Sequence, residues 1–269
     1  MTPLTSEQKI GPNVLYADIG NSTIDFLVTD FLTFRMDKVN TRNRMEVFAY
    51  LKGNPEIAAL YVSSVNSPGL TLLLDNFRTL YPMAEIHVLN KETMVSYSER
   101  RHIRVDNANI LGADLFCDIV ARDNREGEII IDLGTASKIL FVDQDSYFRG
   151  CQIFPGLSSF PETLHAKTDL LKNGPILYNP PLVSLKTEEC ISSGVINGAS
   201  ALIAGMIEEI KKEYGCLNPT IVLTGGNAYL VKEVLKKFTD TDYEYDPYHV
   251  LKGLIRISGR DVSFMKEKR

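Results

Sequence analysis

Internal repetition is the feature that most restricts the fold of this 269-residue chain. The segments Leu15–Val28 and Ile129–Val142 both contain a β-prone run, an Asp-x-Gly turn, small polar residues and a second β-prone run. Asp132 follows Asp18 by 114 residues. Two hairpins with a glycine turn can arise by coincidence, but matching strands on both sides of the turn favour the duplication of one unit.

The rest of the chain alternates strand and helix patterns, which is typical of an α/β protein. We expect strands at 14–17, 24–28, 58–65, 85–89, 129–131 and 220–223, and helices at 68–81, 112–122, 193–214 and 231–238. Apolar spacing stops in the charged loop 122–128. We therefore place the boundary between two lobes in this loop. The expected parts are a flexible leader at 1–13, an N-terminal lobe at 14–125 and a C-terminal lobe at 126–269, and each lobe has the size of an ordinary domain.

Composition argues against several classes of protein. The chain has 29 basic and 34 acidic residues, a net charge of −5, and no basic cluster, which argues against binding to duplex nucleic acid or to a membrane surface. No apolar run reaches the roughly 18 residues of a membrane helix, and the N-terminus lacks a signal-peptide stretch. The four cysteines lack metal-ligand spacing and favour a reduced, cytosolic protein.

The two Asp-x-Gly turns point to a phosphorylated ligand. Gly20 and Gly134 have no Cβ, so the backbone there can take positive φ and approach a ligand closely. Inward-pointing amides of such a turn bind phosphate oxygens. A carboxylate beside a phosphate is repulsive unless a cation lies between them, so Asp18 and Asp132 suggest Mg²⁺ or a monovalent ion. Neither GxxxxGK[ST] nor GxGxxG is present, which argues against P-loop kinases and ordinary dehydrogenases.

A third glycine-rich element, Thr224-Gly-Gly226-Asn227, follows the strand Ile221–Leu223 and precedes a helical pattern. Such a junction lets an adenosine lie against bare backbone. Together with the paired turns, it predicts a nucleotide clamped in a cleft between two similar halves.

Six motifs follow one another along the chain: D-x-G-N-[TS] at Asp18–Ser22, G-x-D-R at Gly112–Leu115, D-x-G-[TS]-A at Asp132–Ala136, G-G-x-I-x-P-G at Gly150–Gly156, N-T-x-x-[AS]-I-x-S-G at Lys186–Gly194 and [TS]-G-G at Thr224–Gly226. In this order they resemble the motifs of the type III pantothenate kinases, which belong to the sugar kinase/actin/heat-shock-70 superfamily. The resemblance implies an α/β fold of duplicated ribonuclease-H-like (actin-like ATPase) domains, with the nucleotide cleft between two lobes.

The resemblance also implies a reaction and its residues. A cytoplasmic homodimer would phosphorylate pantothenate with ATP and Mg²⁺, the first step of coenzyme A synthesis. Asp114 would accept the proton of the pantothenate hydroxyl, and Asp132 would hold a monovalent cation, K⁺ or NH₄⁺. The ATP-binding residues would be Asp18, Ile19, Gly20, Asn21, Ser22, Thr23, Ile24, Asp25 and Thr135. Pantothenate would contact Gly112, Ala113, Asp114, Leu115 and Thr187.

Three of these residues also have ordinary structural interpretations. Asp114 follows Gly-Ala at the start of a helix pattern, where Asp is a common N-cap. Thr187 could likewise be an N-cap, because Thr187-Glu-Glu-Cys is typical of the first turn of a helix. Asp18 could be a simple turn residue, although its paired copy at Asp132 makes this less favourable.

Most departures from the family pattern lie in or beside the motifs that would bind pantothenate, the acceptor of the phosphoryl group. Leu115 replaces an Arg that we expect to hold the pantothenate carboxylate, and Leu cannot form that bidentate pair. Two alternatives therefore stay open: a nucleotide-binding regulatory relative without kinase activity, and a kinase of the same superfamily for a different small alcohol. Compensating arginines could be Arg100, Arg101, Arg104 or Arg122. The other departures are Asp25 for a basic residue, Val105 for Tyr, Ala108 for Pro and Cys151 for Gly.

Overall fold

The computed structural model describes residues 13–29, 34–41, 43–54, 56–106, 111–122 and 127–260. The expected leader at 1–13 lies outside these residues except for Asn13, which is the first residue of a strand. Ala108 and most of the expected boundary loop at 122–128 also lie outside them.

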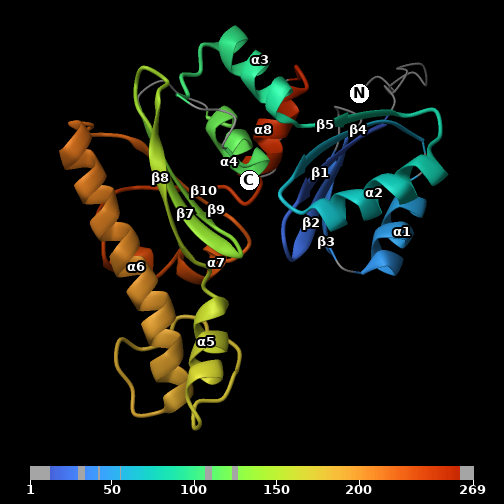
Figure 1. The fold of residues 1–269 in the computed structure, drawn as a ribbon. Helices are drawn as coiled ribbons and strands as arrows, with labels where there is room; N and C mark the ends of the chain where they lie inside the picture. The colour runs from blue at the N-terminus through green and yellow to red at the C-terminus, as the bar shows by residue number, and fades with distance from the viewer. Residues whose placement is uncertain are drawn as a thin grey trace, which may run out of the picture. The chain divides into compact units, whose positions relative to one another are not determined.

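Two five-stranded mixed sheets form the framework of the protein (Figure 1). The first sheet has the order β3-β2-β1-β4-β5 and the second the order β10-β9-β6-β7-β8. The first comprises β1 Asn13–Ile19, β2 Thr23–Thr29, β3 Phe34–Asn40, β4 Ile57–Ser64 and β5 Glu85–Val88. The second comprises β6 Glu128–Leu133, β7 Ala136–Val142, β8 Phe148–Pro155, β9 Thr220–Thr224 and β10 Glu244–Tyr245.

The second sheet, followed from β8 to β10, repeats the first strand by strand. Each central strand, β1 or β6, pairs antiparallel with the next strand of its hairpin and parallel with β4 or β9. The outer pairs match as well, since β2–β3 and β7–β8 are antiparallel and β4–β5 and β9–β10 are parallel. The predicted duplication is confirmed, and Asp18 and Asp132 occupy equivalent positions near the ends of the central strands.

Eight α-helices accompany the sheets in the described part of the chain, and most of the predicted ones are confirmed. The stretch predicted as a helix at 231–238 instead forms the end of one short helix and a 3-10 turn, Leu235–Lys237. Its residues Val231, Val234 and Leu235 are fully buried, so packing overrides helix propensity there. The helices are α1 Arg44–Lys52, α2 Ser67–Leu80, α3 Lys91–Arg101, α4 Ala113–Val120, α5 Ser159–Lys167, α6 Thr187–Tyr214, α7 Ala228–Val231 and α8 His249–Ile257.

The chain forms two compact units, each with one sheet. The first unit contains the residues up to Met94, a segment that ends at Ala121 and the residues from Val250 on. The second contains a segment that begins at Val95 and the residues Arg122–His249. The expected lobes, 14–125 and 126–269, assign the end of α3 to the first lobe and α8 to the second. In the structure, packing groups the end of α3 with the second unit and α8, from Val250 on, with the first.

Helix α6 corrects one expectation. Among the residues that the structure describes, it is long and apolar enough to cross a membrane, by length and composition alone. However, 56% of its most apolar window is buried inside the protein. Val195, Ile196, Ile203 and Ile207 of α6 belong to the core of the second unit. These contacts are typical of the central helix of a folded domain.

Close packing of α8 on α4 explains why the end of the chain belongs to the first unit. A Cβ placed on Gly253 of α8 would overlap the backbone of Cys117 in α4. Beside this contact, the Arg256 guanidinium donates a hydrogen bond to the carbonyl oxygen of Val120 at 3.3 Å. The hydroxyl groups of Tyr16 and Ser258 are 2.9 Å apart and tie the end of α8 to β1. Helix α4, which carries Asp114, is therefore fixed by a contact that only glycine permits.

Replacing Gly253 by alanine is expected to lower the free energy of unfolding by roughly 1–3 kcal/mol, because the added methyl group forces α8 away from α4. Urea unfolding followed by circular dichroism measures the change. Gly53→Ala is the matched control in the same unit, because its Cβ would meet nothing closer than 3.4 Å. An equal loss of stability in both variants would contradict the proposed contact.

Candidate active site

The first Asp-x-Gly turn is a closed hairpin turn with an exposed tip. The amide of Gly20 donates to the carbonyl oxygen of Thr23 at 2.9 Å, and the amide of Thr41 donates to that of Ser22 at 3.1 Å. Asn21 and Ser22 are exposed. Gly20 does not have a positive φ. A Cβ there would lie 3.3 Å from the Thr23 oxygen, so the tightness of the hairpin, not a left-handed backbone, favours glycine.

The amino-terminal end of α2 lies beside this turn. A Cβ on Gly69 in the first turn of α2 would collide with the side chains of Thr41 and Ile19. Asn66 caps the helix by accepting a hydrogen bond from the amide of Gly69 at 2.8 Å. The amide of Val65 donates to the Ile19 oxygen at 3.1 Å. A helix amino terminus carries a partial positive charge, which favours an anion at the turn.

Asp114 lies at the start of α4, close to the same edge of the sheet. The N-cap of α4 is Gly112, so the N-cap interpretation of Asp114 is wrong. Asp114 is half-buried, and its Oδ1 accepts a hydrogen bond from the amide of Leu115 at 2.8 Å. A Cβ on Gly112 would lie 3.6 Å from Val65 Cγ1, and Val65 follows β4 directly. The start of α4 and the first turn therefore flank the carboxyl end of β4.

The buried thiol of Cys117 lies within the electrostatic influence of Asp18 and Asp114. Burial raises the pKa of Cys117 well above its usual value, and the negative charges of Asp18, Asp118 and Asp114 raise it further. The structure thus brings Asp18 and Asp114 into one electrostatic neighbourhood and adds Asp118, which sequence reasoning missed. A thiol with a raised pKa is a poor nucleophile, which agrees with a packing role for Cys117.

The second Asp-x-Gly turn has a different electrostatic partner. Asp132 on β6 stands opposite Lys138 on β7, and the Lys138 Nζ lies 2.6 Å from the Asp132 Oδ2. Both side chains are almost fully buried. The carboxylate expected to hold a metal ion is therefore paired with an ammonium group. No group of three or more His, Cys, Asp or Glu residues that could hold a metal occurs within the described ranges.

Two neighbouring segments hold the second turn in place. The Asn227 side-chain amide donates to the Gly134 oxygen at 3.2 Å, and the backbone amide of Asn227 donates to the Leu133 oxygen at 2.8 Å. On the other side, the amide of Gly156 donates to the oxygen of Thr135 at 3.1 Å. Gly134, like Gly20, does not have a positive φ. Thr135 remains exposed, so its hydroxyl is accessible to a ligand.

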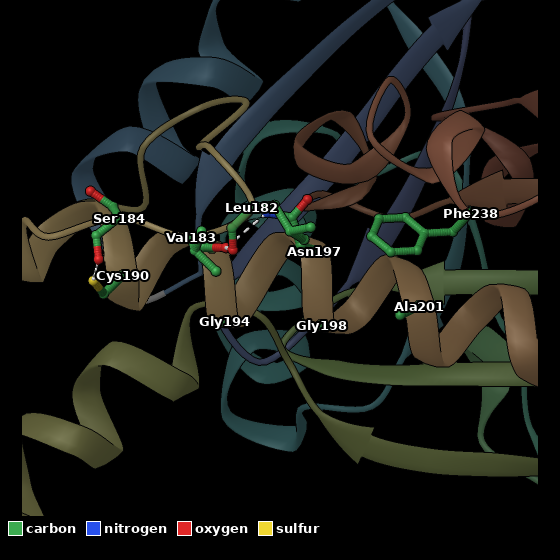
Figure 2. A pocket seen from close by; sticks show the side chains of 10 residues that line it. Leu182, Val183, Ser184, Cys190, Gly194, Asn197, Gly198, Ala201 and Phe238 are labelled. Carbon is green, nitrogen blue, oxygen red and sulfur yellow. Dashed lines mark hydrogen bonds between the residues drawn. The ribbon is translucent and has the colours of Figure 1, made fainter.

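Thr187 lies in a different part of the second unit. It is the first residue of α6, and the N-cap is Lys186, so the N-cap interpretation of Thr187 is wrong. Thr187 is exposed and lines an apolar pocket of about 460 Å³ with Phe160, Leu164 and Leu185. A second pocket of about 480 Å³ lies on the neighbouring side of α6 (Figure 2). Neither pocket is lined by Asp132 or Thr135.

The arginines considered as substitutes for the missing Arg at position 115 all have other contacts. Arg122 is buried beside Glu128, 3.9 Å from Nε to Oε2, and burial lowers the pKa of its guanidinium. Arg104 stacks over the ring of Tyr147 at 5.0 Å. Arg101 lies over the ring of Tyr97, and Arg100 donates to the Ser96 oxygen. Leu115 itself is half-buried on α4.

Comparison with known proteins points to one family. A family model described as type III pantothenate kinase matches residues 14–209. The type III pantothenate kinase of Acholeplasma laidlawii is 29% identical over 94% of this chain and 97% of its own length. The type III pantothenate kinase of Thermosipho africanus is 30% identical over 90% of this chain and 96% of its own length. A putative Baf family transcriptional activator from Campylobacter jejuni shares the fold, with a TM-score of 0.58 and 20% identity over 91% of this chain and 97% of its own.

Proposed function

Because this chain belongs to the type III pantothenate kinase family, we propose that it transfers the γ-phosphoryl group of ATP to the hydroxyl group of pantothenate, the first step of coenzyme A synthesis. The observation that carries this function is the family match over residues 14–209, which includes Asp18, Asp114 and Asp132. Tests of acceptor use and of nucleotide binding distinguish this function from the two alternatives that the sequence leaves open.

Asp114 is the base in this reaction. Phosphoryl transfer needs a group that orients the attacking oxygen and accepts its proton. The proton of the pantothenate hydroxyl passes to the Asp114 carboxylate, and the oxygen forms a bond to the γ-phosphorus. The bond between the γ-phosphorus and the bridging oxygen breaks, and ADP leaves. The half-buried position of Asp114 and its fixed helix support this role.

The ATP-binding residues come from both Asp-x-Gly turns. Residues 18–25 and Thr135 would bind the nucleotide. The exposed tip of the first turn and the adjacent helix terminus support contacts with phosphate oxygens. Asp18, half-buried and opposite Asp25, fits Mg²⁺, because Mg²⁺ is usually bound by one or two carboxylates together with substrate phosphates. When bound, Mg²⁺ would neutralise the charge of these phosphates.

Asp114→Asn is expected to lower the rate of ADP formation with pantothenate by about 10²- to 10⁴-fold, because the amide cannot accept the proton. ATP binding, measured by calorimetry, should remain. Asp75→Asn is the matched control, since Asp75 is an exposed aspartate on α2 of the same unit, and its rate should equal that of the wild type. A wild-type rate for Asp114→Asn would contradict the assignment of the base.

Leu115 supports one alternative, a kinase for a small alcohol without a carboxylate. A leucine on α4 gives the acceptor no bidentate partner for a carboxylate. In this reading the chain would phosphorylate pantothenol, in which an alcohol replaces the carboxylate, as well as it phosphorylates pantothenate.

Leu115→Arg is expected to lower the KM for pantothenate by roughly tenfold and to leave the KM for pantothenol unchanged, because the guanidinium restores a charge-assisted pair with the carboxylate. Steady-state kinetics with both acceptors measures the effect, and Leu115→Met controls for altered packing. An equal change for both acceptors would show that position 115 does not face the carboxylate. ATP binding without turnover on either acceptor would favour the regulatory relative.

The homodimer implied by the resemblance has a suitable surface on α6. Gly194, Gly198 and Ala201 follow one another along the pocket side of this helix (Figure 2). A Cβ on either glycine would meet no atom within 4 Å, so the single chain leaves this side open. Val183 and Leu185, which line the adjacent pockets, are 83% exposed and fully exposed. A contiguous apolar surface of this kind favours burial against a second copy.

Light scattering of the wild-type protein should give the mass of two chains, and Val183→Glu should give the mass of one, because a charge in an apolar interface costs desolvation energy. Met83→Glu, at an equally exposed apolar residue of the first unit, should remain dimeric. A wild-type monomer at micromolar concentration would overturn the dimer.

The cytoplasm is the compartment that the cysteines support. No disulfide joins Cys117, Cys151, Cys190 or Cys216, all of which the structure describes. Free thiols persist in the reducing environment of the cytosol, where coenzyme A precursors and ATP are available.

A further inference from the structure

The carboxylate expected to hold a monovalent cation already has a positive charge beside it. The cross-strand register places Lys138 directly opposite Asp132, and its Nζ donates a hydrogen bond to Oδ2 at 2.6 Å. Lys138 is only 9% exposed, so its charge is removed from bulk water together with that of its partner. A buried ammonium group is stable only when it is paired, which makes this contact a fixed part of the second unit.

The other oxygen of this carboxylate is enclosed by backbone. A Cβ placed on Gly225 would overlap Asp132 Oδ1, so the glycine backbone packs directly against that oxygen. Gly225 has a φ of +92°, a conformation that favours glycine. One oxygen of Asp132 therefore faces an ammonium group and the other a glycine backbone.

These surroundings do not fit a potassium ion at Asp132. A potassium ion at Oδ2 would meet the Lys138 ammonium at close range, and two like charges repel strongly in a buried site. An ammonium group and a potassium ion carry the same charge and have similar sizes. Lys138 thus supplies at this oxygen the single positive charge that a bound cation would provide.

The equivalent position in the first unit carries the opposite charge. The strand position opposite Asp18 is occupied by Asp25, and its counterpart opposite Asp132 is Lys138. Asp25 is paired with Lys38 on β3, at 2.7 Å from Oδ1 to Nζ. The duplicated hairpins therefore differ in charge, because a second carboxylate faces the aspartate in one and an ammonium group in the other.

We propose that Lys138 replaces the monovalent cation at Asp132, so that the kinase activity of this chain does not depend on potassium. This inference rests on the proposed pantothenate kinase function. Lys138 acts as a positioning residue: it neutralises Asp132 and holds the end of β6, from which the Gly134–Thr135 turn begins. It does not itself take part in the transfer of the phosphoryl group.

The first test compares initial rates of phosphopantothenate formation in KCl and in choline chloride at equal ionic strength. The wild-type rates should agree within twofold. Lys138→Ala should be at least tenfold slower in choline chloride and should recover in KCl or NH₄Cl, because the truncated side chain leaves room for the ion. Lys138→Arg keeps the charge and should remain independent of potassium. Lys236→Ala, which removes an exposed ion pair in the same unit, should behave like the wild type.

The second test needs no activity. The melting temperature of Lys138→Ala should rise more in KCl than in choline chloride, whereas the wild type should show no difference between the salts. A wild-type rate that increases tenfold or more with potassium would overturn the proposal, and this result requires no variant. Absence of turnover in every buffer would instead refute the proposed function, and the melting temperatures would still decide the cation question.

Discussion

Each central strand pairs with an antiparallel neighbour on one side and with a parallel neighbour on the other. The positions of the turns and of their side chains follow from these pairings. The antiparallel pairing of β1 with β2 closes the first glycine turn, and the parallel pairing with β4 places Ser63 next to Asp18. In the second sheet, the same pairings place Lys138 and Thr224 on either side of Asp132. Backbone hydrogen bonds thus determine which side chains meet at each turn.

The two copies keep this backbone and differ in charge. The first unit gathers carboxylates, since Asp18, Asp114 and Asp118 all act on the buried Cys117 thiol. Such a region suits a divalent cation and a base. In the second unit the aspartate is neutralised by Lys138, and its turn is held by Asn227 and Gly156. The two copies therefore share one architecture and differ in the charges that surround their turns.

Local patterns predicted the repeat, most strands and the positions of the turns, because strand alternation and Asp-x-Gly turns are encoded by neighbouring residues. The rest depends on contacts between distant residues. Gly253 could not be linked to Cys117 from the sequence, so α8 was expected in the wrong lobe. The partner of Asp132 depends on the register between β6 and β7. In the sequence, the lysine within the apolar run Ala136–Val142 is the one sign of a buried partner for this carboxylate. Position 115 was recognised as a departure, but the contacts of the arginines around it required the structure.

Every role proposed for these residues depends on the formation of phosphorylated pantothenate by this chain. Its most direct test is to incubate the purified protein with ATP, Mg²⁺ and pantothenate and to identify the products by mass spectrometry and phosphorus NMR. ADP and 4′-phosphopantothenate are expected in equal amounts. ATP that is bound but not consumed, or hydrolysed while pantothenate stays unchanged, would contradict the proposed function.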